Sequence, residues 1–481
     1  MRQRKQPEDR RLLPTLLLLT ISATTFAADP VPIGSTRQLF VDAMLVGSLK
    51  GVRRVLHSPR RAEIAIAVEH PWEEFGVSYM TVFRDGNRFR AWYRVDGKAL
   101  SDRRSMTAYA ESSDGIRWTK PTLGLIEFNG SNKNNLVWTG PGVNMSVFKD
   151  GNPAAPDSER YKAIVRTGDV LALVSPDGLR WRLVQDEPIL TDRPFDSHNI
   201  AYWDAHRGHY VAYTRGVARG ERLGAGASSS FGKGVRGIRR ATSKDFRNWS
   251  KLELIDLGDT PLEHLYTNSA VPYDRSPGLV LMFPSRFVNT RRSNPARKEI
   301  GVNDIVFMSS RDGLKFDRSF MEAFLRPGRD PRVWNDRALY LERGILQTSP
   351  TELSLFAMHH WRLPSVHIRR LVLRVDGFVS VRAPYAGGEL VTRPLMFDGR
   401  RLRVNYATSA AGSIRVEIQD AGGNPIDGFS LADCPEIYGD TIDGLIRWKA
   451  GDDVSRLAGR PVRLRFVMKD ADLYAFRFGD K

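Results

Sequence analysis

The segment Ser-Ser-Asp-Gly-Ile-Arg-Trp at residues 112–118 is the strongest indication of the architecture, because versions of it recur along the chain. Related segments occupy residues 175–181, 243–249 and 310–316, and a shorter version, Val-Asp-Gly-Phe, occupies residues 375–378. The gaps between the five aspartates are 63, 68, 67 and 64 residues. Near-equal spacing of five copies predicts a repeat architecture.

Each copy predicts a tight turn that is followed by a large aromatic residue. Asp tolerates a turn and bonds local backbone amides, and Gly accepts a positive φ. The Trp or Phe that follows is large enough to pack between neighbouring sheets. Runs rich in β-forming residues, such as Met106–Glu111 and Val170–Val174, precede the turns. One repeat fits a four-stranded sheet with long loops, so the sequence predicts an all-β, five-bladed β-propeller. An all-β sandwich with coincidental Asp-Gly turns is the alternative.

The length of 481 residues suggests two or three domains. We predict a propeller over residues 29–384, whose first strand begins in Gln38–Val46. The repeat stops after Pro384, and residues 385–481 contain alternating apolar and polar runs. This C-terminal part is predicted to be a small β-sandwich that packs on the propeller.

Residues 1–28 have the features of a secretory signal peptide. Basic residues at the start are followed by the apolar run Leu12–Ser22 and by small residues at Thr25–Ala28. The sequence therefore predicts a secreted or periplasmic protein. No later run reaches transmembrane length. Cys434 is the single cysteine, which excludes an internal disulfide and argues against a cysteine-based metal site.

The formal net charge of +17 raises the question of an acidic partner. Lys and Arg are spread over the whole length, and no nucleic-acid-binding motif is present, so nucleic acid is not expected. Anionic glycans or an anionic envelope surface explain the charge equally well. No cofactor and no metal are expected, because the sequence contains no run of metal ligands.

The chemistry of a propeller belongs at the mouth of the central channel where the inner strands begin. The residues at or just before those expected strands are Trp72, Glu73, Glu74, Ser78, Asn144, Asp196, His198, Asn199, Glu263, His264, Tyr266, Asn268 and Gln347. Carboxylates stand at this level in blades one, three and four. A carboxylic acid that protonates the leaving oxygen and a carboxylate opposite it are what glycosidic cleavage requires.

The catalytic candidates are therefore Glu73, Glu74, Asp196 and Glu263. The candidates for substrate binding are Trp72, His198, Asn199, His264, Tyr266, Asn268, Arg286 and Gln347. Each carboxylate also has a non-catalytic interpretation. The first two could be solvated loop charges, Asp196 could cap a turn or strand, and Glu263 could form a surface pair with His264.

Five segments carry a resemblance to a known group of proteins. They are Gln38–Asp42, Tyr109–Trp118, Glu263–Asn268, Ser349–Ser354 and Gly428–Cys434. With them the chain resembles the five-bladed propeller glycoside hydrolases of families 32 and 43, followed by a small β-sandwich. It looks most like secreted proteins described as having a family 32 N-terminal-like domain. The resemblance covers nearly all of the chain after residue 28.

The resemblance implies roles for carboxylates on three blades. Matched by position, Glu73 or Glu74 would be the base or nucleophile, Asp196 the residue that sets the pKa of the acid, and Glu263 the general acid. These families use Asp in blade one, and the chain has no Asn-Asp-Pro-type motif. Retention or inversion of configuration depends on the carboxylate separation, which a sequence does not give.

The predicted function is a secreted glycoside hydrolase that acts on a glycan end or side branch. Arg215 and Arg286, at the ends of inner hairpins, favour an acidic or sulfated sugar, because guanidinium groups suit carboxylate and sulfate recognition. One alternative is a glycan-binding propeller without catalysis. Another is a sialidase-like enzyme, whose turn motif is similar but has an extra residue between Asp and Gly.

Overall fold

The computed structural model describes residues 29–480 apart from short gaps. The gaps are residues 100–101, 197, 221–222, 225–227, 229–233, 297–300 and 336–338. The predicted signal peptide of residues 1–28 lies outside the described residues. The described chain is built from β-strands with three short 3₁₀ helices, η1 (Pro71–Glu73), η2 (Asp157–Glu159) and η3 (Ser455–Leu457). None of its helices is long and apolar enough to cross a membrane. The predicted all-β class is confirmed.

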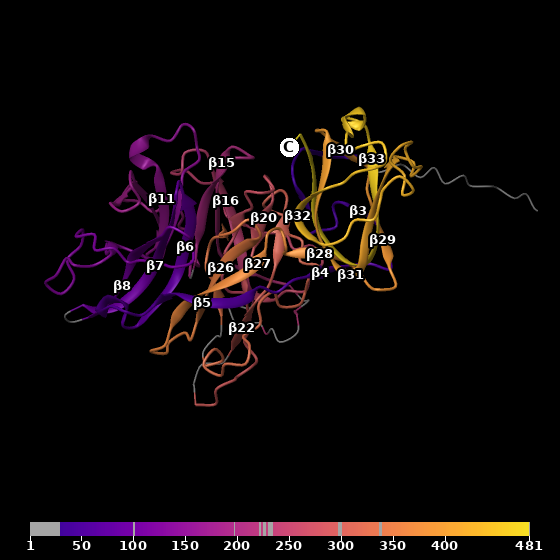
Figure 1. Ribbon diagram of the computed structural model, residues 1–481. Coiled ribbons are helices and arrows are strands. Elements are labelled where there is room, and N and C mark those ends of the chain that lie inside the picture. The colour runs from indigo at the N-terminus through magenta and orange to yellow at the C-terminus, as the bar shows by residue number, and fades with distance from the viewer. Residues whose placement is uncertain are drawn as a thin grey trace, which may run out of the picture.

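Three sheets of four strands each follow one another along the chain (Figure 1). The first contains β6 (Gly76–Asp85), β7 (Arg88–Ala99), β8 (Asp102–Ser112) and β9 (Leu136–Trp138). The second contains β10 (Val143–Lys149), β11 (Tyr161–Arg166), β12 (Val170–Ser175) and β13 (Arg182–Leu183). The third contains β14 (Ile200–Asp204), β15 (His209–Ala218), β16 (Val235–Ser243) and β17 (Glu253–Leu254). These are blades one to three of a propeller.

Blade four is interrupted, so that each of its first three strands appears as two pieces in two small sheets. One sheet contains β18 (His264–Leu265), β21 (Ser285–Val288) and β22 (Val302–Ile305). The other contains β19 (Val271–Pro272), β20 (Val280–Met282) and β23 (Met308–Ser310). Isolated bridges join Ile305 to Leu325 and Ser309 to Asp317, which adds an irregular fourth strand.

Blade five is closed by a strand from the other end of the propeller segment. Its own strands are β24 (Tyr340–Leu341), β25 (Leu346–Gln347), β26 (Glu352–His359) and β27 (His367–Arg374). The outermost strand, β5 (Arg60–Ala67), pairs antiparallel with β27. This pairing joins the first and last parts of the ring, so the five blades surround a common axis.

The repeated Asp-Gly segments form the predicted turns. In the first copy, Oδ1 of Asp114 accepts hydrogen bonds from the backbone amides of Ile116 (2.8 Å) and Arg117 (2.9 Å). Gly115 has φ +72°, and its amide donates to Oγ of Ser112 at 2.8 Å. The aspartates of the next three copies, which bond two amides each, are Asp177, Asp245 and Asp312. The turn prediction is confirmed for these four copies, because one carboxylate satisfies two amides in each of them.

The ring after the turn packs against a neighbouring blade, as predicted. Trp118 of blade one lies edge-on to Phe356 of blade five, with ring centroids 6.0 Å apart. Phe316 of blade four lies edge-on to Tyr213 of blade three at 5.9 Å. These contacts bury apolar surface between blades, so the repeat stabilises the ring as a whole.

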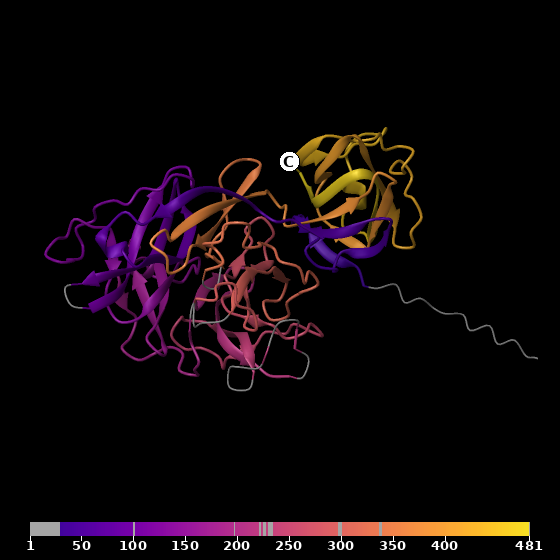
Figure 2. The ribbon, with the colours of Figure 1, turned by 90° about the horizontal axis from the view of Figure 1, so that it is seen from below.

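The second domain is a ten-stranded sheet that folds on itself as a sandwich. Its strands are β1 (Val31–Gly34), β2 (Gln38–Leu39), β3 (Val46–Lys50), β4 (Arg53–Leu56), β28 (Val379–Ala383), β29 (Gly388–Thr392), β30 (Leu395–Phe397), β31 (Arg401–Asp420), β32 (Asp440–Leu445) and β33 (Val462–Gly479). Figure 2 shows the indigo N-terminal strands against the yellow C-terminal ones.

The domain boundaries therefore differ from the predicted 29–384 and 385–481. Residues 31–56 belong to the sandwich, as does β28, whereas the propeller strands span residues 60–374. The physical reason is pairing: β33 is long enough to bond β2 as well as four strands that follow the propeller in the chain. A strand pattern gives no indication of which distant partner it will join.

The fifth repeat aspartate fastens the two domains together. Asp376 is fully buried, with φ +60°. Its carboxylate accepts from the hydroxyl of Tyr273 at 2.6 Å and from Nε and Nη2 of Arg275 at 2.8 and 3.0 Å. Arg37, which lies between β1 and β2 of the sandwich, approaches it to 3.5 Å. The shorter fifth copy of the repeat thus places its aspartate at the centre of the ion pairs between the two domains.

Candidate functional site: the two mouths of the propeller channel

The innermost strands run from one mouth of the central channel to the other. At the first mouth these strands begin, and we call it the strand-start mouth; it is defined by Tyr79, Asn144, Asp196, Tyr266 and Tyr340. At the second mouth the first hairpin of each blade turns, and we call it the turn mouth; it is defined by Arg84, Lys149, Trp203, Arg275 and Gln347. The sequence placed the candidate site at the strand-start mouth.

Glu73, a predicted catalytic residue, is a structural carboxylate. It is fully buried at the end of η1. Oε2 accepts from the amides of Glu69 (2.9 Å) and His70 (3.2 Å) and from Nζ of Lys120 (2.9 Å). Oε1 accepts from the hydroxyl of Tyr93 at 2.9 Å. Four donors saturate both oxygens, so Glu73 cannot meet a substrate without breaking the cap of η1.

Glu263, the predicted general acid, is held between two guanidinium groups. Oε1 lies 3.1 Å from Nη1 of Arg286, and Oε2 lies 3.0 Å from Nη2 of Arg318. Arg286 is itself bound bidentately by Asp304, at 2.9 and 2.6 Å. The Glu263 side chain is only 8% exposed. Because both oxygens accept charged hydrogen bonds, the geometry does not suit proton donation to a leaving group.

Glu74 and Asp196 are the two predicted carboxylates that remain reachable. Glu74 is exposed at the C-terminal cap of η1. Asp196 is 44% exposed, and its Oδ2 accepts from Nη1 of the buried Arg215 at 3.1 Å. Arg215 also donates to the carbonyl oxygen of Tyr266 on blade four. The ion pair therefore anchors an accessible carboxylate at the junction of blades three and four.

Aromatic rings and guanidinium groups from neighbouring blades meet at this mouth. Arg94 donates to Oδ1 of Asn144 at 2.9 Å and lies over the ring of Tyr79. The ring of Tyr79 is 6.4 Å from that of Tyr340, which in turn is 5.6 Å from that of Tyr266.

Two further cation–π and ring contacts extend this set. The guanidinium of Arg215 lies 4.6 Å from the ring centre of Tyr266. Trp361 packs edge-on against Tyr340 at 6.3 Å. These side-chain contacts thus form a network that includes all five blades and ends at Asp196.

Other predicted binding residues support this mouth from within. Nδ2 of Asn268 donates to the carbonyl oxygen of His198 at 3.0 Å, and Oδ1 of Asn199 accepts from the amide of Arg215 at 3.3 Å. His264 is buried, where it accepts from the amide of Arg236 at 3.1 Å. Burial lowers the pKa of His264. These side chains hold inner strands in place and do not face an open surface.

Two predicted binding residues lie away from the strand-start mouth. Trp72 stacks on His70 with ring centroids 4.5 Å apart, and its Nε1 donates to Oδ1 of Asn135 at 2.9 Å. It therefore packs within blade one. Gln347 lies at the turn mouth, where its Oε1 accepts from Nη1 of Arg275 at 3.3 Å.

Two buried titratable groups lie on the inner strands between the mouths. Glu342 is 2% exposed; Oε2 accepts from the amide of Met80, and Oε1 has no partner among the described residues. Desolvation raises the pKa of Glu342 to about 8. Both ring nitrogens of His198 are buried without a partner in the described chain, and desolvation lowers the pKa of this histidine to about 3. The channel axis therefore favours uncharged forms of both groups.

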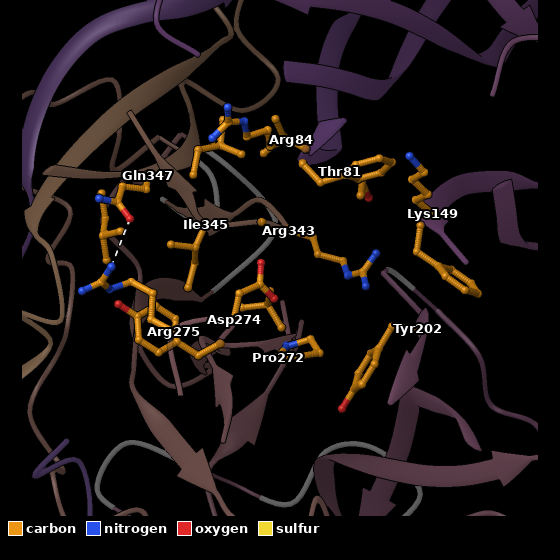
Figure 3. Close-up of a pocket in the computed structure, with 18 of the residues that line it drawn as sticks. Thr81, Arg84, Lys149, Tyr202, Pro272, Asp274, Arg275, Arg343, Ile345 and Gln347 are labelled. Atoms are coloured by element: carbon orange, nitrogen blue, oxygen red, sulfur yellow. Dashed lines mark hydrogen bonds between the residues drawn. The ribbon is translucent and has the colours of Figure 1, made fainter. Parts of the chain in front are cut away.

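The turn mouth opens into a cavity of about 440 Å³ that is lined by residues from all five blades (Figure 3). Its charged side chains are Arg84, Lys149, Asp274, Arg275 and Arg343. Tyr202 and Trp203 contribute aromatic surface, and Pro272 and Ile345 contribute aliphatic surface. This volume lies in the range that small-molecule sites occupy.

The sequence did not identify Arg343 or Asp274, because neither belongs to a repeat or to a known motif. Glu-Arg-Gly at residues 342–344 is the signal that could have found the first of them, since a charged pair in an otherwise apolar inner strand is unusual. Within the described ranges, no three His, Cys, Asp or Glu side chains lie close enough to hold a metal ion.

Comparisons with known proteins find similarity at the level of structure. No family model matches the chain, and no curated protein sequence matches it. A solved structure described as a glycoside hydrolase shares 16% identity at a TM-score of 0.42, over 66% of this chain and 92% of that one. A glycosyl hydrolase from Bacteroides ovatus shares 15% identity at 0.41, over 66% and 94%. The catalytic domain of a Coprinopsis cinerea GH62 α-L-arabinofuranosidase shares 12% at 0.42, over 67% and 98%. Solved structures that resemble this chain thus include glycoside hydrolases.

Proposed function

We propose that this protein is a glycoside hydrolase that takes an acidic glycan at the strand-start mouth. One observation carries the proposal: rings and guanidinium groups from four blades, with the amide of Asn144 from blade two, form a contact network that ends at the half-exposed carboxylate of Asp196. Aromatic faces suit the apolar faces of sugar rings, and guanidinium groups suit carboxylate or sulfate substituents. Arg94, whose side chain is 20% exposed, contributes a guanidinium that also donates to the buried carboxylate of Asp96 at 2.9 Å.

Glu74 and Asp196 are the carboxylates that would supply acid and base. Glycosidic cleavage needs two such groups on opposite sides of the bond. Asp196 lies on blade three and Glu74 on blade one, both on the side where the inner strands begin. The saturated oxygens of Glu73 and Glu263 argue against the assignment that family resemblance suggests for those two positions.

The test measures release of reducing sugar from uronic, sulfated and neutral glycans by the purified protein and three variants. Asp196→Asn and Glu74→Gln are expected to lower kcat by at least about 100-fold, the usual contribution of an acid or base. Glu74→Gln should leave thermal stability unchanged, whereas Asp196→Asn should also reduce it, because the buried Arg215 loses its carboxylate partner. Glu263→Gln is the matched control and should reduce stability more than kcat. Loss of kcat in Glu263→Gln alone, at full stability, would restore the family assignment and contradict ours.

A second candidate function is glycan binding without cleavage. It is favoured by the saturation of two of the four predicted catalytic carboxylates, which leaves recognition groups in place. It predicts that acidic glycans bind the wild-type protein and the Asp196→Asn variant with equal affinity, while neither releases sugar. Titration calorimetry on the same glycan panel separates the two candidates.

We also propose that the protein is exported, on the strength of residues 1–28. Expression of the full chain in a bacterium, followed by N-terminal sequencing of the exported protein, tests this. Cleavage after Ala27 or Ala28 is the expected result, and an intact N-terminus in the cytosolic fraction would contradict it.

A further inference from the structure

The cavity at the turn mouth contains a buried charge without a counter-ion. Arg343 is 5% exposed, and burial lowers its pKa to about 10, so the guanidinium stays charged at neutral pH. Nη1 donates to the carbonyl oxygen of Val147 at 2.8 Å, and Nε donates to that of Ala270 at 3.4 Å. In the part of the chain that the structure describes, no carboxylate forms an ion pair with Arg343.

An uncompensated buried charge is costly, and two other cations of the cavity are paired with carboxylates. Lys149 is paired with Asp85 at 2.6 Å, and Arg275 is paired bidentately with Asp376. Leaving a buried guanidinium unpaired costs several kcal/mol, so such a group is retained where something else supplies the opposite charge. An anion that enters from the turn mouth can supply the negative charge that Arg343 lacks.

The position of the guanidinium fits this role. Arg343 projects from the inner strand of blade five into the centre of the cavity, toward Tyr202 and Lys149 (Figure 3). Its Nη2 donates to no described residue, whereas Nε and Nη1 fix the plane of the group. A guanidinium that is held by two bonds and has one nitrogen free is already oriented for an anion.

The cations that line the cavity outnumber its one carboxyl, Asp274, so the charge of the lining favours an anionic ligand. Asp274 accepts no hydrogen bond from the described residues, and desolvation raises its pKa. The aromatic face of Trp203 and the aliphatic surface of Ile345 and Pro272 would contact the uncharged part of the ligand.

We propose that the turn mouth is a second binding site, independent of the strand-start mouth. Its ligand is a small organic anion of about the size of an acidic monosaccharide, whose carboxylate, sulfate or phosphate pairs with Arg343. This proposal does not depend on the proposed hydrolase activity, because it rests on residues at the other end of the channel.

The test is titration calorimetry of the whole protein with glucuronate, glucose 6-sulfate, glucose 6-phosphate and glucose. At least one anion is expected to bind and glucose is not, and the three anions reveal which charged group is preferred. Arg343→Met should weaken the preferred anion at least about 10-fold, as loss of a charged hydrogen bond predicts. Arg94→Met, at the strand-start mouth, should leave this binding unchanged.

A second variant keeps the test decisive if Arg343→Met fails to fold. Ile345→Trp narrows the cavity and leaves the charge of Arg343 in place, and it should abolish binding. Three results would overturn the proposal: no anion binds the wild-type protein at about 10 mM, glucose binds as well as the anions, or both variants fold and bind with wild-type affinity. Loss of binding in Arg94→Met alone would assign the anion to the other mouth.

Discussion

The two mouths of the channel carry similar residue types but compensate their charges differently. At the strand-start mouth, Asp196 is paired with Arg215, and Glu263 is paired with two guanidinium groups. At the turn mouth, Arg343 has no described carboxylate partner, and Asp274 has no described donor. The strand-start mouth thus resembles a preassembled recognition surface, whereas the turn mouth is electrostatically incomplete.

Residue type alone therefore says little about whether a charged group is available to a ligand. A carboxylate whose oxygens are saturated contributes to stability, and one without donors can bind or react. Substitutions at paired and unpaired positions should accordingly have opposite consequences, with stability lost at the first kind and retained at the second.

The sharpest contrast lies between two adjacent residues of blade one. Glu73→Gln removes the charge that Lys120 and three other donors share, and breaking such a buried pair costs about 3–5 kcal/mol in the free energy of unfolding. Glu74→Gln, one residue on and exposed, should change that free energy by less than about 0.5 kcal/mol. Urea unfolding that is followed by tryptophan fluorescence measures both. Equal effects of the two substitutions would mean that Glu73 is not the cap of η1.

A second pair compares the mouths directly. Glu263→Gln should lower the free energy of unfolding by about 2–3 kcal/mol, because Arg286 and Arg318 lose their shared carboxylate. Asp274→Asn at the turn mouth should cost less than about 0.5 kcal/mol or should stabilise, since desolvation penalises the charged form of this carboxyl. The same urea titrations report both values. If Asp274→Asn proved the more costly change, the unpaired description of the turn mouth would be wrong.

The repeat determined most of the fold because its physics is local. One carboxylate and one glycine or aromatic residue complete each turn, so Asp114, Asp177, Asp245 and Asp312 could be read from spacing alone. The domain boundary could not be predicted in this way. Whether β1–β4 join the propeller or the sandwich depends on long-range pairing with β28–β33, which leaves no mark in the N-terminal strands themselves.

The candidate site was predictable in place but not in detail. Sequence reasoning located Asp196, Tyr266 and the supporting Asn268 at the strand-start mouth, because inner strands begin there. It could not show that Glu263 is enclosed by Arg286 and Arg318, since the second of these comes from a distant irregular segment. Saturation of a carboxylate depends on partners that are far away in the chain.

The buried Glu342, which lies between the two mouths, should make the free energy of unfolding depend on pH. Glu342 has a pKa of about 8 in the folded protein, against 4.5 as its ordinary value, so its contribution to stability is present at low pH and is lost as the pH rises through 8. His198 has a pKa of about 3 in the folded protein, against 6.5 as its ordinary value, so it changes the free energy of unfolding only below pH 6.5. Between pH 6.5 and 8, Glu342 should therefore lower the free energy of unfolding by up to about 1.4 kcal/mol per pH unit.

Glu342→Gln isolates this effect, because glutamine keeps the shape and does not titrate. Chemical unfolding of the wild-type protein at about pH 6.5, 7.25 and 8 should show a decline that the variant lacks. An identical decline in both proteins would assign the pH dependence to groups away from the axis.

A weaker effect is expected for anion binding at the turn mouth. As the pH falls, Asp274, whose pKa desolvation raises, takes up a proton, and one negative charge leaves the cavity. The cations that face it keep their charge over the same range; they are Arg84, Lys149, Arg275 and Arg343. The affinity for glucose 6-sulfate, whose own charge is constant, should therefore rise as the pH is lowered from 7, by about threefold to tenfold once Asp274 is protonated, the order expected for one charge in a partly exposed site. Calorimetry with Asp274→Asn is the control, and its affinity should be independent of pH. A pH-independent affinity in the wild-type protein, with tight binding throughout, would place the ligand out of reach of Asp274 and nearer to the channel axis.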